Sequence, residues 1–401
     1  MGEAPHSWFR LSARSGVHSL ARVSGVSNSS DSVSDYDYSY PPEAVAQEPA
    51  AQRDAARLLA VTPAAAVTPA SAVAPTASVT PIGESAIWHD GCVRDLPSLL
   101  RAGDLLVLNE VRVRAARVEG TRLSTGGRVS ALVLAERGAQ AELLIGTRGR
   151  LQSGEELRLG GARWRLEHSL GEGRWDARLL DAGEVSDLLS ERGRMPLPPY
   201  IERARDADPR DAADRERYQT AFGDGTRAPR GAAAPTAGLH FTPELLARLE
   251  SVGVPHARLE LEVGVGTFRP LRGESLDEHD MHEERYTIPE SLLAAYAACR
   301  ARGGRVVAVG TTVVRALESA VRDDGRRLEA GSAATRLFLR PGARFAAVDA
   351  LLTNFHQPRS SLLVLVSAFA GRETIRHAYT SALERGYRFF SYGDAMLLAA
   401  R

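Results

Sequence analysis

The stretch GGRVVAVGTTVVRALESAV, residues 303–321, contains a complete change of secondary structure. Val306 to Val309 are consecutive apolar residues, and they predict a strand that is buried on both faces, because a solvated face would require alternating polar residues. Gly310 allows a sharp turn, and the residues after it predict a helix. A buried strand followed at once by a helix is typical of α/β proteins.

The same pattern of buried strands and helices recurs on both sides of this stretch. Residues 105–109, LLVLN, predict a buried strand that ends at Asn109, and residues 349–371 predict a strand, a loop and a long apolar helix. Between about Arg114 and Leu180, short alternating runs are separated by glycine-containing turns, which is typical of a small antiparallel barrel. We therefore expect a discontinuous α/β sandwich domain with an inserted small antiparallel β-barrel domain.

These textures divide the chain into four parts. Residues 1–32 predict a disordered N-terminal extension, residues 33–113 the first part of the α/β domain, residues 114–187 the inserted barrel, and residues 188–401 the second part with the active-site loops. Residues 62–81 form a Thr/Pro/Ala-rich loop, because prolines at that density exclude a helix or a central strand.

Composition excludes several classes of protein. The 401 residues carry 50 basic and 50 acidic side chains, so no global basic field points to nucleic acid, and every basic residue is arginine. Without lysine, Schiff-base catalysis is excluded. Two distant cysteines indicate a reducing cytoplasm, and no apolar run approaches the ~18 residues of a membrane span. We expect a cytoplasmic protein that does not enter a membrane.

Four loops are expected at the ligand-binding edge of the sheet. In α/β sheets, ligands bind beyond the carboxyl ends of the strands. The loops that follow predicted strands begin at Asn109, at Gly266-Thr267, at Gly310 and at Asn354-Phe355-His356.

The Gly310 loop is the clearest of the four. Thr311 or Thr312 is expected to cap the helix, and the exposed amides there suit a carboxylate or a phosphate. Arg315 lies about one turn further along this helix. A plain helix cap without a ligand explains the same residues equally well.

His240 stands between Leu239 and Phe241, just ahead of a helix that Pro243 is expected to open. A core histidine is the simpler interpretation of such a position. Thr236 and Gly238 nevertheless allow the backbone to approach a ligand closely. We therefore predict that His240 faces the active-site cleft.

The segment HDMHEE, residues 279–284, allows three interpretations. Metal ligation is the least favoured, because no second cluster of ligands matches it, and no metal site is expected. A hydrogen-bonded acid/base pair of His282 with Glu284 or Glu283 is preferred. A solvated polar face is the remaining alternative.

Two common motifs are excluded. Gly264 and Gly266 form G-x-G, but Pro270 follows and disfavours the helix that a dinucleotide site requires. The nucleophile elbow G-x-S-x-G of serine hydrolases does not occur in the sequence.

A set of longer motifs in one order resembles a known family. The motifs are MPLPPYIER (195–203), RYQTAF (217–222), AAPTAGLHFTPELL (233–246), VGVGTFRP (263–270), HDMHEE (279–284), VAVGTTVVRALE (307–318), DALLTNFHQPRSSLLVLVSAFAG (349–371) and YRFFSYGDAML (387–397). From Val33 to Met396 the chain resembles the S-adenosylmethionine:tRNA ribosyltransferase-isomerases of queuosine biosynthesis. It departs from the usual family pattern at residues 109–111 and 229–232, and at Ala115 and Gln357.

This resemblance implies a reaction. The ribosyl part of S-adenosylmethionine is transferred to the aminomethyl group of 7-aminomethyl-7-deazaguanine at the tRNA wobble position and isomerised, giving epoxyqueuosine-tRNA with release of adenine and methionine. The chemistry needs a base near the 5′-carbon, a proton donor for adenine, and sites for the methionine carboxylate and ammonium. The implied partners are tRNA and S-adenosylmethionine, a consumed substrate; no other cofactor is implied, and a monomer is expected.

Residue roles follow from the motifs. The catalytic residues implied are His240, His282, Glu284 and His356. The substrate-binding residues implied are Asn109, Tyr200, Thr236, Gly238, Phe241, Gly266, Thr267, Gly310, Thr311, Thr312, Arg315, Asn354 and Phe355, with the methionine carboxylate at residues 310–312. The arginines that adjoin motif loops, and so suit tRNA phosphates, are Arg117, Arg203 and Arg359. Two alternatives remain: a relative that uses S-adenosylmethionine on another acceptor, and a non-catalytic RNA-binding relative.

Overall fold

The computed structural model describes residues 32–63, 80–82, 86–204, 208–225, 229–264, 266 and 270–400. The expectations for residues 1–31, for most of the 62–81 tract and for Thr267 therefore lie outside the described residues. No helix among the described residues is long and apolar enough to cross a membrane.

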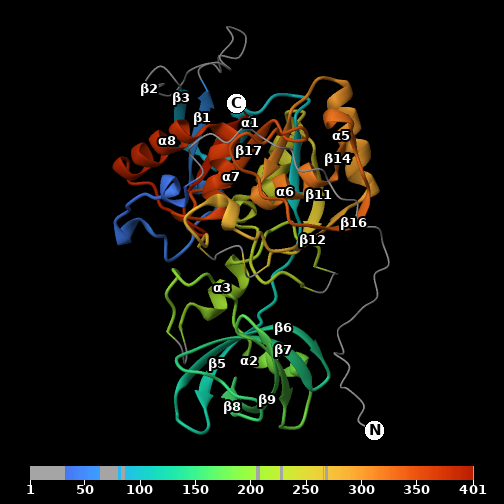
Figure 1. Ribbon diagram of the computed structural model, residues 1–401. Helices are drawn as coiled ribbons and strands as arrows, with labels where there is room; N and C mark the ends of the chain where they lie inside the picture. The colour runs from blue at the N-terminus through green and yellow to red at the C-terminus, as the bar shows by residue number, and fades with distance from the viewer. Residues whose placement is uncertain are drawn as a thin grey trace.

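The larger body of the molecule is built on one mixed sheet (Figure 1). Its described strands are, in spatial order, β16 (Gly331–Thr335), β12 (Glu284–Ile288), β11 (His256–Leu261), β4 (Leu105–Asn109), β13 (Val306–Val309), β17 (Ala350–Asn354), β18 (Ala395–Ala399), β1 (Arg57–Pro63), β3 (Ala86–Cys92) and β2 (Thr80–Ile82). The four central strands β11, β4, β13 and β17 run parallel to one another.

Helices cover both faces of this sheet, and β4 shows why. Leu105 and Val107 point into the core shared with α5 (Glu290–Ala301), α6 (Thr311–Ala320), α7 (Ser361–Ala370) and α8 (Arg372–Glu384). Leu106 and Leu108 point into the opposite core with α1 (Leu96–Leu99) and α4 (Pro243–Ser251). All four side chains are fully buried, so the central strand needs an unbroken apolar run.

Helix starts follow the expected chemistry in α4 and α7. Thr242 accepts a hydrogen bond from the backbone N–H of Leu245, and Pro243 occupies the first helical turn of α4, as predicted. Ser360 caps α7 in the same way. The prediction that Thr311 or Thr312 caps α6 is wrong: the cap residue is Gly310, at φ +94°, and its helix has no side-chain cap.

The smaller body is a closed antiparallel barrel, drawn below the sheet in Figure 1. Its described strands are, in spatial order, β10 (Arg174–Leu179), β7 (Gln140–Thr147), β6 (Arg128–Arg137), β5 (Arg117–Arg122), β8 (Glu156–Leu159) and β9 (Ala162–Gly171). Alternate residues fill the interior around the buried Trp164. The expected α/β fold with an inserted antiparallel barrel is confirmed.

Helix α2 (Val185–Arg192) packs on the barrel, because Val185 and Leu189 belong to the barrel core. We therefore propose to extend the barrel domain to residue 192 and not to end it at 187. The chain then passes through residues 193–204 and α3 (Asp211–Arg217), which Figure 1 shows between the two bodies. A small ribbon of β14 (Val321–Arg322) and β15 (Arg327–Leu328) follows α6.

Candidate active site

The sheet topology brings the predicted loops to one edge. Because β11, β4, β13 and β17 are parallel neighbours, their carboxyl ends lie side by side. The antiparallel neighbours β12 and β18 begin at the same edge, where Leu261 pairs with Tyr286 and Asn354 pairs with Ala395. Two polar centres stand at this edge, one around Asn354 and one around Glu284.

Asn354 organises the first centre. Its Nδ2 donates to the carbonyl of Phe390 at 3.1 Å and to Nε2 of His240 at 3.3 Å, and its Oδ1 accepts from the Thr236 hydroxyl at 3.1 Å. A backbone carbonyl only accepts, so the contact with Phe390 determines which amide atom is nitrogen. The Asn354 amide therefore donates to His240.

His240 is neutral and lies behind Asn354. Accepting a hydrogen bond on Nε2 leaves its proton on Nδ1. Burial, together with the positive charges of Arg388 and Arg53, lowers the pKa of His240 from 6.5 to about 4. The side chain is only 5% exposed. The prediction that His240 faces an open cleft is thus corrected: it holds Asn354 from within the protein.

His356 is the other buried histidine of this centre. Burial lowers its pKa from 6.5 to about 3, and its Nε2 lies 3.0 Å from the Thr353 hydroxyl. Its backbone N–H donates to the Tyr379 hydroxyl at 2.8 Å, and its carbonyl accepts from the Tyr38 hydroxyl at 2.5 Å. The residue is held on three sides, so its position is well defined.

A narrow pocket of about 30 Å³ joins these groups. Its walls include Tyr200, Thr236, Asn354 and His356. The Tyr200 hydroxyl lies 2.7 Å from the Ser391 hydroxyl. A cavity of this size holds about one water molecule. A substrate group would therefore enter only if the bordering side chains move apart.

Glu284 organises the second centre. It is 2% exposed at the start of β12; its Oε1 lies 3.1 Å from Nε2 of His282 and accepts from the Gly264 N–H at 3.2 Å. Its Oε2 forms an ion pair with Nη1 of Arg315. Burial alone would raise the pKa of Glu284, but the hydrogen bond from His282 and the charge of Arg315 outweigh burial and lower it. The expected pairing of His282 with Glu284 is present.

One N–H donor group of Arg315 has no partner among the described residues. Its Nε donates to the Leu337 carbonyl at 3.1 Å and its Nη1 pairs with Glu284, while its Nη2 is buried and has no partner among the described residues. The residue lies one turn inside α6, close to the backbone N–H groups that begin that helix. This end of α6 therefore combines a buried guanidinium donor with a positive helix dipole.

Two glycines line the His282 ring. A Cβ atom at Gly266 would lie 2.7 Å from both Cγ and Nδ1 of His282, whereas a Cβ at Gly264 would approach Cδ2 no closer than 3.5 Å. Contacts near 2.7 Å force the ring to move, while 3.5 Å is ordinary van der Waals contact. The absence of a side chain at Gly266 therefore allows the His282 ring to occupy its observed position.

This difference yields a matched pair of variants. We expect Gly266→Ala to shift His282, which the family resemblance implies is catalytic, away from Glu284. Turnover should slow by about 100-fold, the cost of misplacing a catalytic group by about 1 Å. Gly264→Ala should stay within a few-fold of the parent. Steady-state release of adenine, measured with melting temperatures for both proteins, tests this; equal effects of the two substitutions would contradict it.

Asn109 makes four hydrogen bonds within the protein, and its predicted role in substrate binding stays a prediction. Its Nδ2 donates to the Leu261 carbonyl at 3.0 Å and to the Thr312 hydroxyl at 3.3 Å. Its Oδ1 accepts from the N–H groups of Val111 and Leu261, both at 3.1 Å. These four bonds use the full capacity of the amide. Asn109 thus ties the ends of β4 and β11 to the start of α6.

Three further predicted ligands belong to the core. A Cβ at Gly238 would lie 2.9 Å from the side chains of Phe222 and Thr220, so this glycine allows these side chains to pack closely. Phe241 is fully buried against Phe222. Phe355 is also fully buried and stacks on another ring, at 4.6 Å between centroids, although it borders the narrow pocket.

The remaining predicted ligands lie at the edge as expected. Gly310 adopts φ +94°, which favours glycine and turns β13 directly into α6. Thr311 and Thr312 follow it, both largely buried. The structure therefore brings Thr236, Asn354 and His356 to one centre, and Gly266, His282, Glu284 and Arg315 to the other.

The predicted tRNA-binding arginines differ in their surroundings. Arg203 is only 7% exposed and donates to both oxygens of Asp214 at 2.6 and 3.0 Å, so we withdraw it as a phosphate ligand. Arg117 is 34% exposed and donates to the Leu197 carbonyl. Arg359 is exposed at the tip of its loop.

Several groups at the site were not expected from the sequence. The Phe390 carbonyl and Ser391 lie within the quoted motif YRFFSYGDAML, but nothing in that motif singles them out. Tyr38 and Tyr379 reach His356 from distant parts of the chain. Among the described residues, no group of three His, Cys, Asp or Glu side chains is placed to hold a metal ion.

Comparison with known proteins identifies the family of this chain. Residues 33–398 match the family described as queuosine biosynthesis protein. The chain belongs to this family. It is 49% identical over 376 residues to an S-adenosylmethionine:tRNA ribosyltransferase-isomerase from an Anaeromyxobacter species, covering 92% of this chain and 99% of the relative. A relative of the same name from Aromatoleum aromaticum is 45% identical, with 92% and 97% covered.

A solved family member is also similar. The crystal structure of S-adenosylmethionine tRNA ribosyltransferase from Thermotoga maritima is 30% identical, covers 91% of this chain and 99% of its own, and superposes with a TM-score of 0.47.

Proposed function

We propose that this protein transfers and isomerises the ribosyl group of S-adenosylmethionine onto 7-aminomethyl-7-deazaguanine at the tRNA wobble position, releasing adenine and methionine. Membership of the queuosine biosynthesis family supports this activity. The observation that carries it to particular residues is the array of His282, Glu284 and Arg315 at the carboxyl edge of the sheet.

His282 is the general base in this proposal. The positive sulfonium makes the protons on the adjacent 5′-carbon acidic, and removing one of them requires a base of moderate strength held in place. Glu284 fixes the imidazole by its contact with Nε2 and stabilises the imidazolium that forms, while Arg315 keeps Glu284 ionised. The Nδ1 side, which faces Gly266, then meets the substrate.

The start of α6 is the proposed site for the methionine carboxylate. The carboxylate would take the donor that Arg315 Nη2 leaves open, together with N–H groups at the first turn near Gly310. This places the anionic end of S-adenosylmethionine beside Arg315. The sulfonium and its 5′-carbon would then lie toward His282.

The Asn354 centre is assigned to binding and not to proton donation. Because His240 and His356 have pKa values of about 4 and 3, both are neutral at pH 7 and neither supplies an imidazolium there. Thr236, Asn354 and the hydroxyl of Tyr200 offer donors and acceptors that suit a nucleoside. The amine of the substrate is the nucleophile, so the absence of lysine does not obstruct the reaction.

The activity assay separates three possibilities. Purified protein is incubated with S-adenosylmethionine and a tRNA that carries the aminomethyl base, and free adenine and the mass of the tRNA are followed. We expect one adenine per modified tRNA. Adenine released only with another acceptor would indicate a relative of different specificity, and tRNA binding without adenine would indicate a non-catalytic relative. We further propose a monomer that acts in the cytoplasm without another cofactor.

The affinity for tRNA should depend on salt. Contacts with several phosphates release counterions, so we expect affinity to fall at least about tenfold between ~50 and ~200 mM salt. Arg359→Ala should flatten the slope of log affinity against log salt by about 1, since one phosphate contact is lost. Filter binding at several salt concentrations measures both values. A flat salt dependence in the parent protein would contradict phosphate binding.

A further inference from the structure

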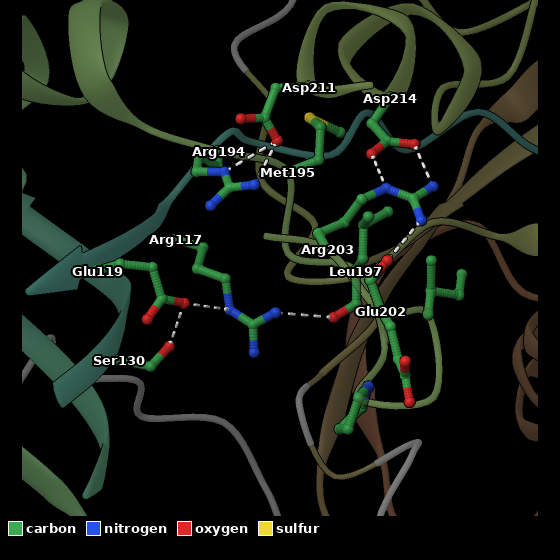
Figure 2. Close-up of a pocket in the computed structure, with 12 residues that line it drawn as sticks. Arg117, Glu119, Ser130, Arg194, Met195, Leu197, Glu202, Arg203, Asp211 and Asp214 are labelled. Atoms are coloured by element: carbon green, nitrogen blue, oxygen red, sulfur yellow. Dashed lines mark hydrogen bonds and ion pairs between the residues drawn. The ribbon is translucent and has the colours of Figure 1, made fainter. Parts of the chain in front are cut away.

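A hollow of about 450 Å³ lies between the barrel and the α/β domain (Figure 2). Arg117, Glu119 and Ser130 line it from the barrel side. The opposite wall comes from the chain that leaves the barrel, including Arg194 and Leu197. None of these residues takes part in the two centres described above.

Glu119 has an unmet hydrogen-bonding capacity. Its Oε1 accepts from the Ser130 hydroxyl at 2.8 Å and lies 3.7 Å from Nε of Arg117. Its Oε2 is buried and has no partner among the described residues. A buried carboxylate oxygen without a donor costs free energy, so it is an acceptor that a ligand N–H would satisfy.

Two other carboxylates that line this hollow are paired with arginines. Asp214 accepts two bonds from Arg203 and one from the Tyr392 hydroxyl at 2.9 Å. Asp211 accepts from Nε and Nη2 of Arg194 at 2.9 and 2.6 Å. Figure 2 shows Asp211 and Asp214 facing their arginines while the carboxylate of Glu119 lies beside Arg117. Glu119 therefore differs from Asp211 and Asp214 in keeping a carboxylate oxygen without a partner among the described residues.

One short segment connects the hollow to the Asn354 centre. Met195, Leu197 and Pro199 line the hollow, and a second hollow of about 430 Å³ shares Arg117, Ser130, Leu197 and Pro199 with it. The next residue, Tyr200, borders the pocket of Asn354 and His356. The two hollows and the nucleoside site proposed at Asn354 thus follow one another along residues 195–200.

The chemistry of the walls suits a nucleobase. Leu197, Pro199 and Met195 offer apolar contact for a flat ring, and Glu119 offers a hydrogen-bond acceptor. Single-stranded RNA is recognised in this manner, with unstacked bases inserted into pockets and read along their hydrogen-bonding edges. We propose that this hollow takes one base of the anticodon loop next to the wobble nucleotide, with Glu119 Oε2 accepting a hydrogen bond from an N–H of that base. This inference rests on the proposed function, and it assigns the wobble nucleotide to the nucleoside site proposed at Asn354.

Glu119→Gln is the informative substitution. Arg117 Nε is a donor only, so the glutamine carbonyl stays on that side and its NH₂ group takes the place of the unpartnered Oε2. The variant then places its NH₂ donor opposite the N–H donor of the base, while the side chain keeps nearly the same shape. The control is Glu155→Gln, a barrel carboxylate whose side chain is 9% exposed and pairs with Arg122 outside both hollows.

The test measures binding of an anticodon stem–loop RNA in which each loop nucleotide in turn is abasic. In the parent we expect one position beside the wobble nucleotide to lose about tenfold in affinity when abasic. The Glu119→Gln variant should bind the intact RNA with an affinity lower by a similar factor. It should bind the RNA that is abasic at that position no more weakly than it binds the intact RNA. Glu155→Gln should behave like the parent, with folding of all variants verified by thermal melting.

Each outcome decides the question. Equal weakening of every RNA by Glu119→Gln, or no weakening, overturns the inference, as does the absence of any position that couples to Glu119. The assay needs no turnover, so coupling without adenine release would reject the proposed function and keep the base-binding hollow. Adenine release without coupling would support the proposed function and reject the base-binding hollow.

Discussion

Glu284→Gln should reduce the rate of adenine release by about 10³-fold. The amide keeps the size of the carboxylate but removes the charge that orients His282 and stabilises its protonated form, and removal of an acid/base function costs roughly 10²–10⁴-fold. The readout is single-turnover adenine release with saturating S-adenosylmethionine and tRNA. Glu283→Gln is the matched control, because Glu283 is the adjacent carboxylate, is 49% exposed and pairs with the surface residue Arg336.

The same substitution has a cost in stability that the experiment must separate from catalysis. Removing the charge of Glu284 leaves Arg315 buried without its counterion, and breaking such a pair costs about 3–5 kcal/mol. His282→Gln supplies the second variant, since the His282 side chain is 25% exposed and its loss strands no buried charge. We expect comparable loss of turnover with a nearly unchanged melting temperature. Full activity in His282→Gln would refute its assignment as the base.

Glu284 also predicts how stability varies in acid. Its pKa in the folded protein is lower than the ordinary value of 4.5, so its stabilising contribution is complete above that value. The contribution is lost as the pH falls below 4.5 toward the lowered pKa. In Glu284→Gln this part of the acid dependence should disappear, which urea titrations at several pH values would measure.

Asn354→Asp should abolish most activity and change the protonation of His240. A carboxylate in place of the amide cannot donate to the Phe390 carbonyl or to His240 Nε2, and its charge favours the imidazolium. We expect the pKa of His240 to rise from about 4, and turnover to fall about 100-fold or more because the proposed nucleoside site is reorganised. Imidazole resonances followed by NMR against pH test the first point, and adenine release tests the second.

The pH dependence of stability provides a check on this variant. A histidine whose pKa is lowered in the folded state contributes stability that is complete above the unfolded value of 6.5 and is lost as the pH falls toward 4. Raising the pKa of His240 by Asn354→Asp should shrink this loss between pH 6.5 and 4. Asn354→Ala, which adds no charge, should lose activity and leave the pKa of His240 below 6.5. An unchanged pKa in Asn354→Asp would disprove the contact between the two side chains.

The main architecture was predictable from the sequence because it depends on local patterns. Unbroken apolar runs such as Val306–Val309 require a strand that is buried on both faces. Alternating runs between Arg114 and Leu180 require strands with one buried and one solvent-exposed face. Glycine at position 310 follows from the turn that must join β13 to α6. Parallel central strands then oblige the predicted loops to share one edge.

The roles of individual side chains depended on partners far away in the chain. Asn109 looked like a ligand because it ends a strand, but its four bonds reach residues from Val111 to Thr312. His240 looked accessible, yet Asn354 covers it. No local pattern records such contacts, since the sequence does not state which distant groups share a hydrogen bond.

The sequence by itself determined the resemblance to the family through its motifs, the order of the main strands and helices, and the barrel inserted between two parts of the α/β domain. It favoured, without settling, a pairing of His282 with Glu284 or Glu283. All of these follow from residue type and short-range spacing. Only the tertiary structure decided that Arg315 completes the Glu284 pair, that Arg203 is buried against Asp214, and that Glu119 keeps a carboxylate oxygen without a donor among the described residues. The physical reason is that burial and hydrogen-bond satisfaction are properties of groups brought together by folding, often from more than a hundred residues apart, as in the contact of Asn354 with His240.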